Sequence, residues 1–339
     1  MVIKKMGKLL KIIILLFICS INLSSLNASS DDFNSWIKSF KLQAIDYGIS
    51  QSTVDKTLSN VKYLSKVIEY DRYQPEFYED TFTYINKRTG RSKLRKGLSL
   101  YKKNKEFINT VEKEFSVEKE LLLSLMGIET NFGNYLGKMD ILSSLATLSF
   151  DKRRSDFFTN ELLTLLKLVD DKKIDIKILY GSWAGAIGNF QFMPSTINNY
   201  AIDYDKNSII ELKKFDDSYA SAANYLNKMG WEKNNPCFIK VKLKKNIPKN
   251  FLNKSAKKII NKKKFKFFKQ YIESPEKYNI SDNLLSGIIT PDKDIVAKAK
   301  DLEPAYVVFN NYELILKWNR SLRFALAVCT LKDQFKNEI

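Results

Sequence analysis

The sequence predicts a mainly α-helical protein of the α+β class, with a small β-containing insertion toward its C-terminal end. Most segments between residues 31 and 235 space their apolar residues three or four positions apart, as one face of a helix requires. Two stretches differ: residues 238–243 mix apolar residues with lysine, and residues 305–309 are almost wholly apolar, so both indicate strands. A change of composition at residues 234–236 predicts a domain boundary there.

The N-terminus has the layout of a secretory signal peptide. Four lysines precede an apolar run over residues 12–21, and a polar stretch ends at Ala28. The run is short for a membrane span, so we expect residues 1–28 to be a cleaved signal. Cys19 follows Ile18, whereas lipoprotein processing requires a small residue there, so lipid anchoring at Cys19 is the less favoured alternative.

Composition narrows the possible chemistry. The 339 residues include no histidine, which excludes Ser-His-Asp triads, Cys-His dyads and His-ligated zinc. Beyond the signal, Cys237 and Cys329 could form a disulfide or remain two buried thiols. The formal charge of +18 favours polyanions, and export favours cell-wall glycan or anionic lipid over nucleic acid. Lysine-rich stretches such as 257–266 could equally be a solvated surface.

Residues 29–110 are expected to form an N-terminal helical domain. Phe33, Trp36, Ile37 and Phe40 lie on one helix face. Further helical segments follow at residues 52–64, 77–84 and 93–101, and the pair Thr89-Gly90 interrupts them.

The block Leu121–Gly133 predicts a helix that carries one acid. Ser116 is the expected N-cap, and leucines at helical spacing define a core face. Glu129 lies beside that face at the helix end. Burial among leucines would raise the pKa of its carboxyl, so that it could donate a proton near neutral pH. The alternative is a solvated or ion-paired Glu129.

The block Gly181–Ser195 predicts tight turns around a polar side chain. Its glycines permit positive φ and close backbone approach. Gln191 stands between Phe190 and Phe192, as in the wall of a sugar-binding cleft, and Pro194 suits the first turn of a helix. The alternative is a packing segment with one exposed amide.

These blocks, in this order, resemble the membrane-bound B type of lytic murein transglycosylases. The resemblance rests on G-I-E-T-x-F-G, A-T-L-S-F, R-R and A-G-A-x-G-x-x-Q-F-M-P-S, and it is strongest between Leu121 and Trp231. It implies a lysozyme-like catalytic core over residues 111–236 behind the N-terminal helical domain. A small β-containing domain (237–309) and a C-terminal helix returning to the core (310–339) would complete the chain.

The resemblance also implies an activity. Family members cleave the β-1,4 bond between N-acetylmuramic acid (MurNAc) and N-acetylglucosamine (GlcNAc) in peptidoglycan without water, and leave 1,6-anhydroMurNAc ends. A single glutamate, here Glu129, acts first as acid and then as base. Neither motif block supplies a second acid, unlike ordinary glycosidases. The alternatives are a muramidase that hydrolyses the bond and a peptidoglycan-binding protein without turnover. We expect a periplasmic monomer that needs no cofactor and works beside other cell-wall synthesis or turnover proteins.

Several further residues are candidates for substrate contact by the same resemblance. They comprise four expected sugar-holding residues, an arginine pair for the carboxylates of stem peptides, and one tyrosine that could equally be core: Ser182, Gln191, Tyr225, Asn319, Arg153, Arg154 and Tyr84. Phe324 stands where the family has a tyrosine, so one polar contact is in doubt.

A possible structural Ca²⁺ site follows the second block. Asp203, Asp205 and Asn207 place oxygen ligands at alternate positions, as in an EF-hand loop. Ser208 replaces the usual glycine, and Lys214 occupies the position of the closing acid. On the family pattern Asp217 would close the site instead. The alternative is a surface turn.

Overall fold

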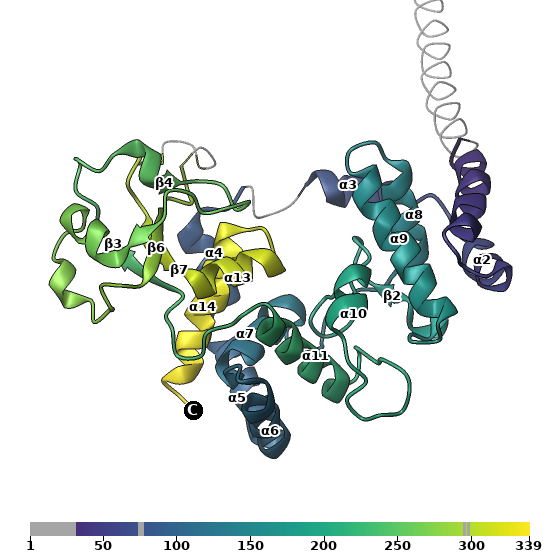
Figure 1. The fold of residues 1–339 in the computed structure, drawn as a ribbon, viewed down its shortest axis with the longest axis horizontal. Helices are drawn as coiled ribbons and strands as arrows, with labels where there is room; N and C mark the ends of the chain where they lie inside the picture. The colour runs from purple at the N-terminus through teal and green to yellow at the C-terminus, as the bar shows by residue number, and fades with distance from the viewer. Residues whose placement is uncertain (1–31, 74–77, 294–295, 297–298) are drawn as a thin grey trace, which may run out of the picture. The chain divides into compact units, whose positions relative to one another are not determined.

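The computed structural model describes residues 32–73, 78–293, 296 and 299–339 (Figure 1). The expected signal peptide and Cys19 lie outside these residues. The fold is mainly helical with one small mixed sheet, which confirms the predicted fold class. The described residues divide into two units. The first unit comprises the chain up to Asp71 together with Met139–Gly185, and the second comprises Arg72–Lys138 and Ala186–Ile339.

The first unit is built on two packed helices, α8 and α9, with a two-stranded ribbon beside them. Residues 32–46 are also helical in this unit. Its other elements are α2 (Gln51–Leu58), α3 (Ser65–Arg72, which reaches the boundary), β1 (Met139–Asp140), α8 (Ile141–Phe150), α9 (Ser155–Asp170), η2 (Ile176–Ile178) and β2 (Tyr180–Gly181). Asp140 caps α8, because its carboxylate accepts the backbone N–H of Leu142 at 3.1 Å.

The second unit combines a helical core with a small sheet. The core helices are α4 (Thr81–Arg88), α5 (Arg91–Lys103), α6 (Lys105–Phe115), α7 (Lys119–Thr130), α10 (Pro194–Tyr200), α11 (Phe215–Lys228), α13 (Asn310–Trp318) and α14 (Leu322–Lys336). Helix α7 packs against α5, α11 and, most extensively, α14. Pro194 begins α10, as predicted.

The N-terminus of α7 differs from the prediction. Ser116 has a φ of +55° and closes α6, so it is not the N-cap of α7; that position belongs to Glu118. Glu118 is buried, and its carboxylate accepts the indole N–H of Trp231 and, at 2.9 Å, the backbone N–H of Asn234. The sequence did not reveal this arrangement, because a serine shortly before a helix is a common N-cap and its left-handed backbone at the end of the preceding helix cannot be read from the sequence.

The sheet lies wholly between residues 238 and 309. Its strands are β3 (Phe238–Val241), β4 (Leu252–Asn253), β5 (Lys263–Lys264), β6 (Leu285–Ile289) and β7 (Ala305–Phe309). The order is β3-β7-β6-β4, with β5 also pairing β6, and only the β4–β6 pair is parallel. The short helices α12 (Phe265–Phe268), η3 (Lys249–Phe251), η4 (Lys269–Tyr271) and η5 (Pro275–Lys277) accompany it. Phe265, Phe268 and Val307 form the centre of its core.

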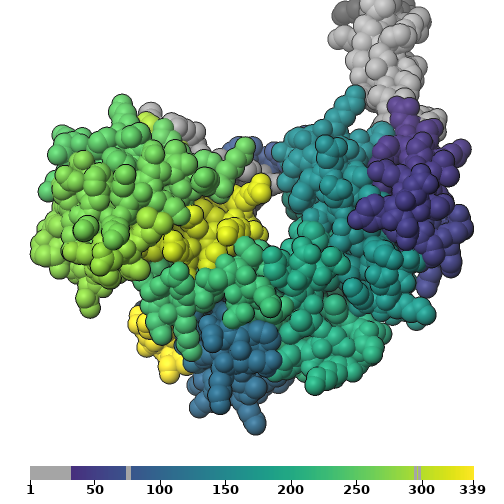
Figure 2. Space-filling view, viewed as in Figure 1, coloured from purple at the N-terminus to yellow at the C-terminus, as the bar shows by residue number. Residues whose placement is uncertain are grey.

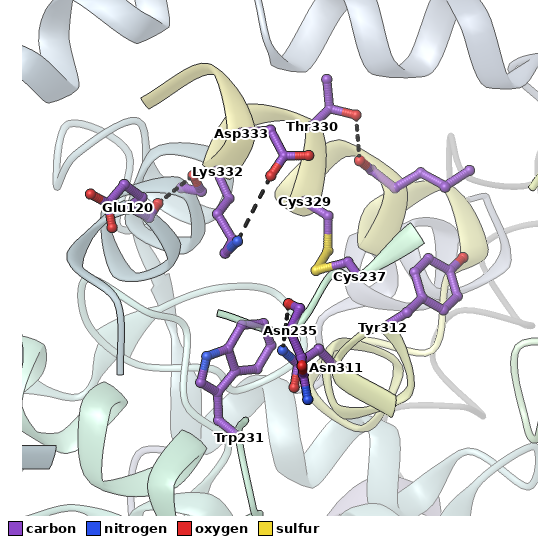
Figure 3. Close-up of a disulfide and its surroundings, with 12 residues drawn as sticks. Glu120, Trp231, Asn235, Cys237, Asn311, Tyr312, Cys329, Thr330, Lys332 and Asp333 are labelled. Carbon is purple, nitrogen blue, oxygen red and sulfur yellow. Dashed lines mark hydrogen bonds and ion pairs between the residues drawn. A yellow bond between two sulfur atoms is a disulfide. The ribbon is translucent and has the colours of Figure 1, made fainter. Parts of the chain in front are cut away.

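Two ties fix this small domain to the helical core. Cys237 and Cys329 form a disulfide with Cα atoms 6.2 Å apart, joining the chain just before β3 to α14 (Figure 3). Elsewhere, the buried Arg323 donates to the Asp292 carboxylate at 2.9 Å, and the same carboxylate accepts the backbone N–H of Thr81 at 2.9 Å. The disulfide resolves the cysteine alternatives in favour of a bond.

The two units divide the chain differently from the expected domains. Residues 32–71 belong with 139–185 rather than with the rest of the expected N-terminal helices, and the second unit continues through the expected boundaries at 110 and 236. The reason is that α2 packs on α9, far along the chain. In the part of the chain that the structure describes, no helix combines the length and apolar character needed to cross a membrane.

Candidate active site

Glu129 lies in the last turn of α7, half-buried. The indole N–H of Trp318, at the end of α13, donates to its carboxyl oxygen Oε1 at 3.0 Å. The two residues are 189 positions apart in the sequence. The hydrogen bond orients the carboxyl group, since a planar donor held in the protein fixes the direction of the oxygen that accepts it.

The end of α7 is fastened to the second motif block by buried polar groups. The hydroxyl of Thr130 donates to the carbonyl of Asn189 at 2.8 Å and accepts the backbone N–H of Gly133 at 3.0 Å. The Asn189 amide nitrogen donates to the Ser218 hydroxyl at 2.9 Å in α11. Both Thr130 and Asn189 are buried. Because buried polar groups are costly to leave unpaired, this network holds Glu129 and the second block in one arrangement.

The second block turns back on itself between Ile187 and Phe192, which form an antiparallel bridge. Gly188 has a φ of +79°, and a Cβ there would lie 2.2 Å from the carbonyl oxygen of Leu212, so the position requires glycine. Gln191 also has a positive φ, +52°. Its amide nitrogen donates to the Gly188 carbonyl at 2.9 Å, so this side chain locks its own turn.

Aromatic rings pack around Trp318, the residue that donates to the Glu129 carboxyl. The Trp318 ring centroid lies 5.0 Å from that of Tyr225 and 5.3 Å from that of Phe192. Tyr225 also packs against Tyr200, with centroids 4.6 Å apart. Burial, with a smaller contribution from Tyr200, raises the pKa of Tyr225 to about 12. Its hydroxyl therefore stays protonated and keeps a donor.

The structure gathers some of the expected site residues in the second unit. Glu129, Gln191, Tyr225 and Asn319 all belong to it, and Asn319 is the C-cap of α13, directly after Trp318. Ser182 belongs to the first unit and follows β2; its carbonyl accepts the backbone N–H of Gly185 at 3.2 Å.

The arginine pair also lies in the first unit, where both side chains bind Asp71. Arg153 donates to its carboxylate at 2.6 Å through Nε, and Arg154 donates to the same group. Burial alone would raise the pKa of Asp71, but the hydrogen bonds and charges of the two arginines outweigh it and lower the pKa. The guanidinium-bearing side chains remain 44% and 40% exposed, so part of each still faces solvent.

Two side chains belong to the core. Tyr84 is 1% exposed and lies beneath the Arg88 guanidinium, 3.5 Å from the ring centroid. No surface is left on it for a sugar, so Tyr84 as a substrate contact is corrected to the core alternative. Phe324 is 3% exposed, in the first turn of α14. A side chain this deep explains why an apolar ring is tolerated there.

The loop after α10 brings three carboxylates together. Oxygen atoms of Asp203, Asp205 and Asp217 lie within 4.8 Å of one another. Ser208 has a φ of +73°, so it adopts the left-handed turn for which EF-hand loops use glycine. The Asn207 side-chain nitrogen donates to Asp205 at 2.9 Å, and Lys214 pairs with Glu211. Three negative charges this close repel one another, and a bound cation would relieve that repulsion. Carboxylate oxygens are the ligands that a hard cation such as Ca²⁺ takes.

Comparison with known proteins identifies the family. The model of the Transglycosylase SLT domain family matches residues 32–333. The chain belongs to this family. The matched range of this transglycosylase includes both motif blocks, the small sheet and most of α14.

Relatives of known identity agree with the assignment. The chain is 37% identical over 141 residues to membrane-bound lytic murein transglycosylase B of Escherichia coli (strain K12). That match covers 41% of this chain and 39% of the relative, so it spans about two fifths of the relative's length.

Solved structures extend the likeness to the whole fold. SltB3 of Pseudomonas aeruginosa, in complex with NAG-anhNAM-pentapeptide, is 28% identical with a TM-score of 0.78, covering 90% of this chain and 79% of that one. The Escherichia coli lytic transglycosylase Slt35, in complex with calcium, is 24% identical with a TM-score of 0.72, covering 91% and 94%, and shows the shared fold.

Sequence reasoning missed three residues of the site. Trp318 gave no signal beyond its place beside Asn319, and nothing connected it with Glu129. Thr130 directly follows Glu129 in the first motif block, and Asn189 lies two residues before Gln191 in the second. Their places inside the motif blocks were the only sign in the sequence that they belong to the site. Their roles depend on a buried contact between distant segments, which one sequence does not reveal.

Proposed function

We propose that this chain is a peptidoglycan lytic transglycosylase. It would cleave the MurNAc–GlcNAc β-1,4 bond without water and leave 1,6-anhydroMurNAc ends. The observation that carries the proposal is the Glu129 carboxyl, held by the Trp318 indole at 3.0 Å beside the Tyr225 and Phe192 rings. An oriented acid beside aromatic surfaces suits protonation of a glycosidic oxygen. Family membership and SltB3, solved with an anhydromuropeptide, support it.

In the proposed mechanism Glu129 acts twice. Its carboxylic acid gives a proton to the glycosidic oxygen as the bond to the anomeric carbon breaks. The resulting carboxylate then takes the proton from the C6 hydroxyl of the muramic residue, whose oxygen bonds to the anomeric carbon of the same sugar. Glu129 ends protonated, ready for the next bond. An intramolecular nucleophile needs orientation above all, so the groups that hold the sugar matter most.

Four side chains are proposed to hold the sugar: Tyr225, Gln191, Asn319 and Ser182. Tyr225 supplies a protonated hydroxyl, since its pKa is raised to about 12. The Gln191 amide nitrogen is engaged by its own turn, so a sugar contact falls to its carbonyl oxygen. We assign Asn319 and Ser182 the same holding role. The exposed parts of Arg153 and Arg154 are assigned to carboxylates of stem peptides.

Glu129→Gln is the decisive variant. We expect cleavage of peptidoglycan sacculi to be lost while the thermal unfolding temperature and sacculus binding are kept, because glutamine has the same shape and still accepts the Trp318 N–H. Released muropeptides would be measured by mass spectrometry, with Glu106→Gln, an exposed position on α6, as the control. Substantial residual cleavage in Glu129→Gln would overturn the assignment.

The products separate the alternatives. Anhydromuropeptides, lighter by one water than reducing-end products, are expected from the unaltered chain. Reducing ends would identify a muramidase. Binding of intact sacculi without release would identify a peptidoglycan-binding protein. We also propose that the chain works in the periplasm as a monomer on glycan strands, beside cell-wall synthesis or turnover proteins and without nucleic acid.

We further propose that the three-carboxylate loop holds a structural Ca²⁺ through Asp203, Asp205 and Asp217, with Asn207 as a further oxygen donor. Asp217 is 1% exposed and already accepts the Tyr204 backbone N–H at 2.8 Å, so the ion would stiffen an ordered loop. No cofactor is proposed for the reaction itself.

Thermal unfolding tests the ion. Millimolar Ca²⁺ should raise the midpoint by several degrees, since a ligand that binds only the folded state stabilises it. Asp217→Asn should remove the rise, and the exposed Asp46→Asn should not. An unchanged midpoint in the unaltered chain with and without Ca²⁺ would exclude the site.

A further inference from the structure

The small domain carries a surface on which positive charge is concentrated. Six of the ten residues 257–266 are lysine, and none is acidic. Lys262 is half-buried and pairs with Glu313 of α13 at 2.8 Å. The other five are exposed, and no carboxylate of the described residues pairs with them; they form the lysine patch: Lys257, Lys258, Lys263, Lys264 and Lys266.

Two large apolar side chains stand exposed among these lysines. Ile260 lies between Lys258 and Lys263 in the chain and is 52% exposed. Leu285, at the start of β6, is 40% exposed and pairs across the strands with Lys264 of β5. Directly opposite residues of antiparallel strands have neighbouring side chains on one face. The edge of the sheet at β5 therefore presents apolar and cationic side chains beside one another.

The exposure of Ile260 is fixed by the fold. The side-chain amide of Asn253, buried in β4, accepts the Ile260 backbone N–H at 2.8 Å and donates to its carbonyl at 3.2 Å. The preceding Ile259 is buried against Gly287 of β6, where an added Cβ would lie 2.4 Å from its Cγ2 atom. With Ile259 packed inward and the next backbone unit held at both ends, the Ile260 side chain is left in solvent.

The lysine patch continues into a pocket of about 350 Å³ where the small domain meets α13, within the second unit. Figure 2 shows these two segments, green and yellow, in contact. Lys257 and Lys258 line the pocket from the small domain, and the exposed Lys317 and Arg320 line it from the end of α13 and just beyond. Like charges around a concave surface focus a positive potential, so the pocket suits a phosphate group.

We propose that this surface docks the chain on a lipid bilayer that contains anionic phospholipids. Ile260 and Leu285 would enter the boundary between headgroups and acyl chains, the lysine patch would lie at the headgroups, and a lipid phosphate would occupy the pocket. Interfacial binding adds buried apolar area to electrostatic attraction, and lysine keeps its ammonium group in water while its stem covers apolar surface.

The exposed apolar pair is what favours a lipid surface over a soluble polyanion. A polyanion in water would neutralise the lysines but would leave Ile260 and Leu285 in solvent, whereas a bilayer removes both from water. The attachment belongs to the folded chain itself, so it needs no covalent lipid and does not depend on the reaction at Glu129.

Cosedimentation with lipid vesicles tests the proposal on the chain without its expected signal peptide, residues 29–339. Vesicles of equal parts phosphatidylglycerol and phosphatidylcholine are compared with vesicles of phosphatidylcholine alone. The charge variant is Lys257→Gln/Lys258→Gln/Lys264→Gln. The apolar variant is Ile260→Thr/Leu285→Thr, which keeps a residue that strands accept.

A matched control removes the same charge from exposed positions on α5 and α6: Lys102→Gln/Lys103→Gln/Lys105→Gln. The thermal unfolding temperature of every variant is measured beside the unaltered chain, so that a loss of binding is read only from folded protein.

The unaltered chain should bind the anionic vesicles and leave the neutral ones. The charge variant should bind the anionic vesicles about tenfold more weakly or worse, and the apolar variant roughly tenfold more weakly, while the control stays within about twofold. The proposal would be overturned if the unaltered chain did not bind the anionic vesicles, if the charge variant lost nothing, or if the control lost as much. Full binding by the apolar variant would also overturn it, and would indicate a surface for soluble polyanions.

Discussion

At the scale of single residues, the site depends on one carboxyl and the groups that position it. Trp318 does not reach the reacting bond in the proposed mechanism; it acts through Glu129, to which it donates at 3.0 Å. Thr130, directly after Glu129, donates to the Asn189 carbonyl and so ties the end of α7 to the second motif block. The chemistry of Glu129 is therefore set by residues from three separate parts of the chain.

Trp318→Phe separates positioning from packing. Phenylalanine keeps an aromatic ring beside Tyr225 and Phe192 but removes the N–H. A hydrogen bond to a charged group contributes about 1.5–3 kcal/mol, so we expect kcat to fall about tenfold or more with KM changed less than about twofold. Steady-state kinetics on a soluble muropeptide would measure this. A rise in KM with kcat unchanged would show that Trp318 binds sugar instead of orienting Glu129.

At the scale of elements, the sequence predicted many of the helices and the strands β3 and β7, but not the short strands between them or the partners of each element. The leucines of α7 and the run Ala305–Phe309 gave their elements directly, because local spacing reports a buried face. The pairing of α2 with α9 and the N-cap of α7 were not accessible. The first depends on a contact between distant segments, and the second on a left-handed Ser116.

The candidate site was predicted unevenly for the same reason. Glu129 and Gln191 lie in ordered motif blocks that point to one family. Tyr84 was named on weaker grounds and proved to be core, since a tyrosine within a helix gives no sign of which way it faces. The arginine pair was expected to reach toward the substrate. Its ion pairs with Asp71 were not predicted, because Asp71 lies in a distant part of the sequence.

The disulfide between the small domain and α14 should contribute measurably to stability. The cysteines are 92 residues apart, so the bond restricts a long loop in the unfolded chain. Cys237→Ser/Cys329→Ser should lower the free energy of unfolding by about 2–5 kcal/mol. Urea denaturation would measure it. Reductant should destabilise the unaltered chain to the same extent and leave the double variant unaffected; a further loss in the double variant would contradict this account.

At the scale of the whole molecule, the excess of lysine should govern association with the cell wall. The formal charge is +18. Screening shortens the reach of charges from about 10 Å at 0.1 M salt to about 3 Å at 1 M. Sedimentation of the Glu129→Gln chain with sacculi should therefore show binding falling steeply as salt rises. Retention unaffected by salt would assign the binding to direct sugar contacts alone.

The order of α7 and α14 along the chain has a consequence for biosynthesis. The helix that carries Glu129 buries its face most extensively against α14, and the indole that orients Glu129 follows it by 189 residues. Since a chain is made from its N-terminus, the catalytic acid is synthesised long before either support. A partly made chain therefore carries the motif without the finished site.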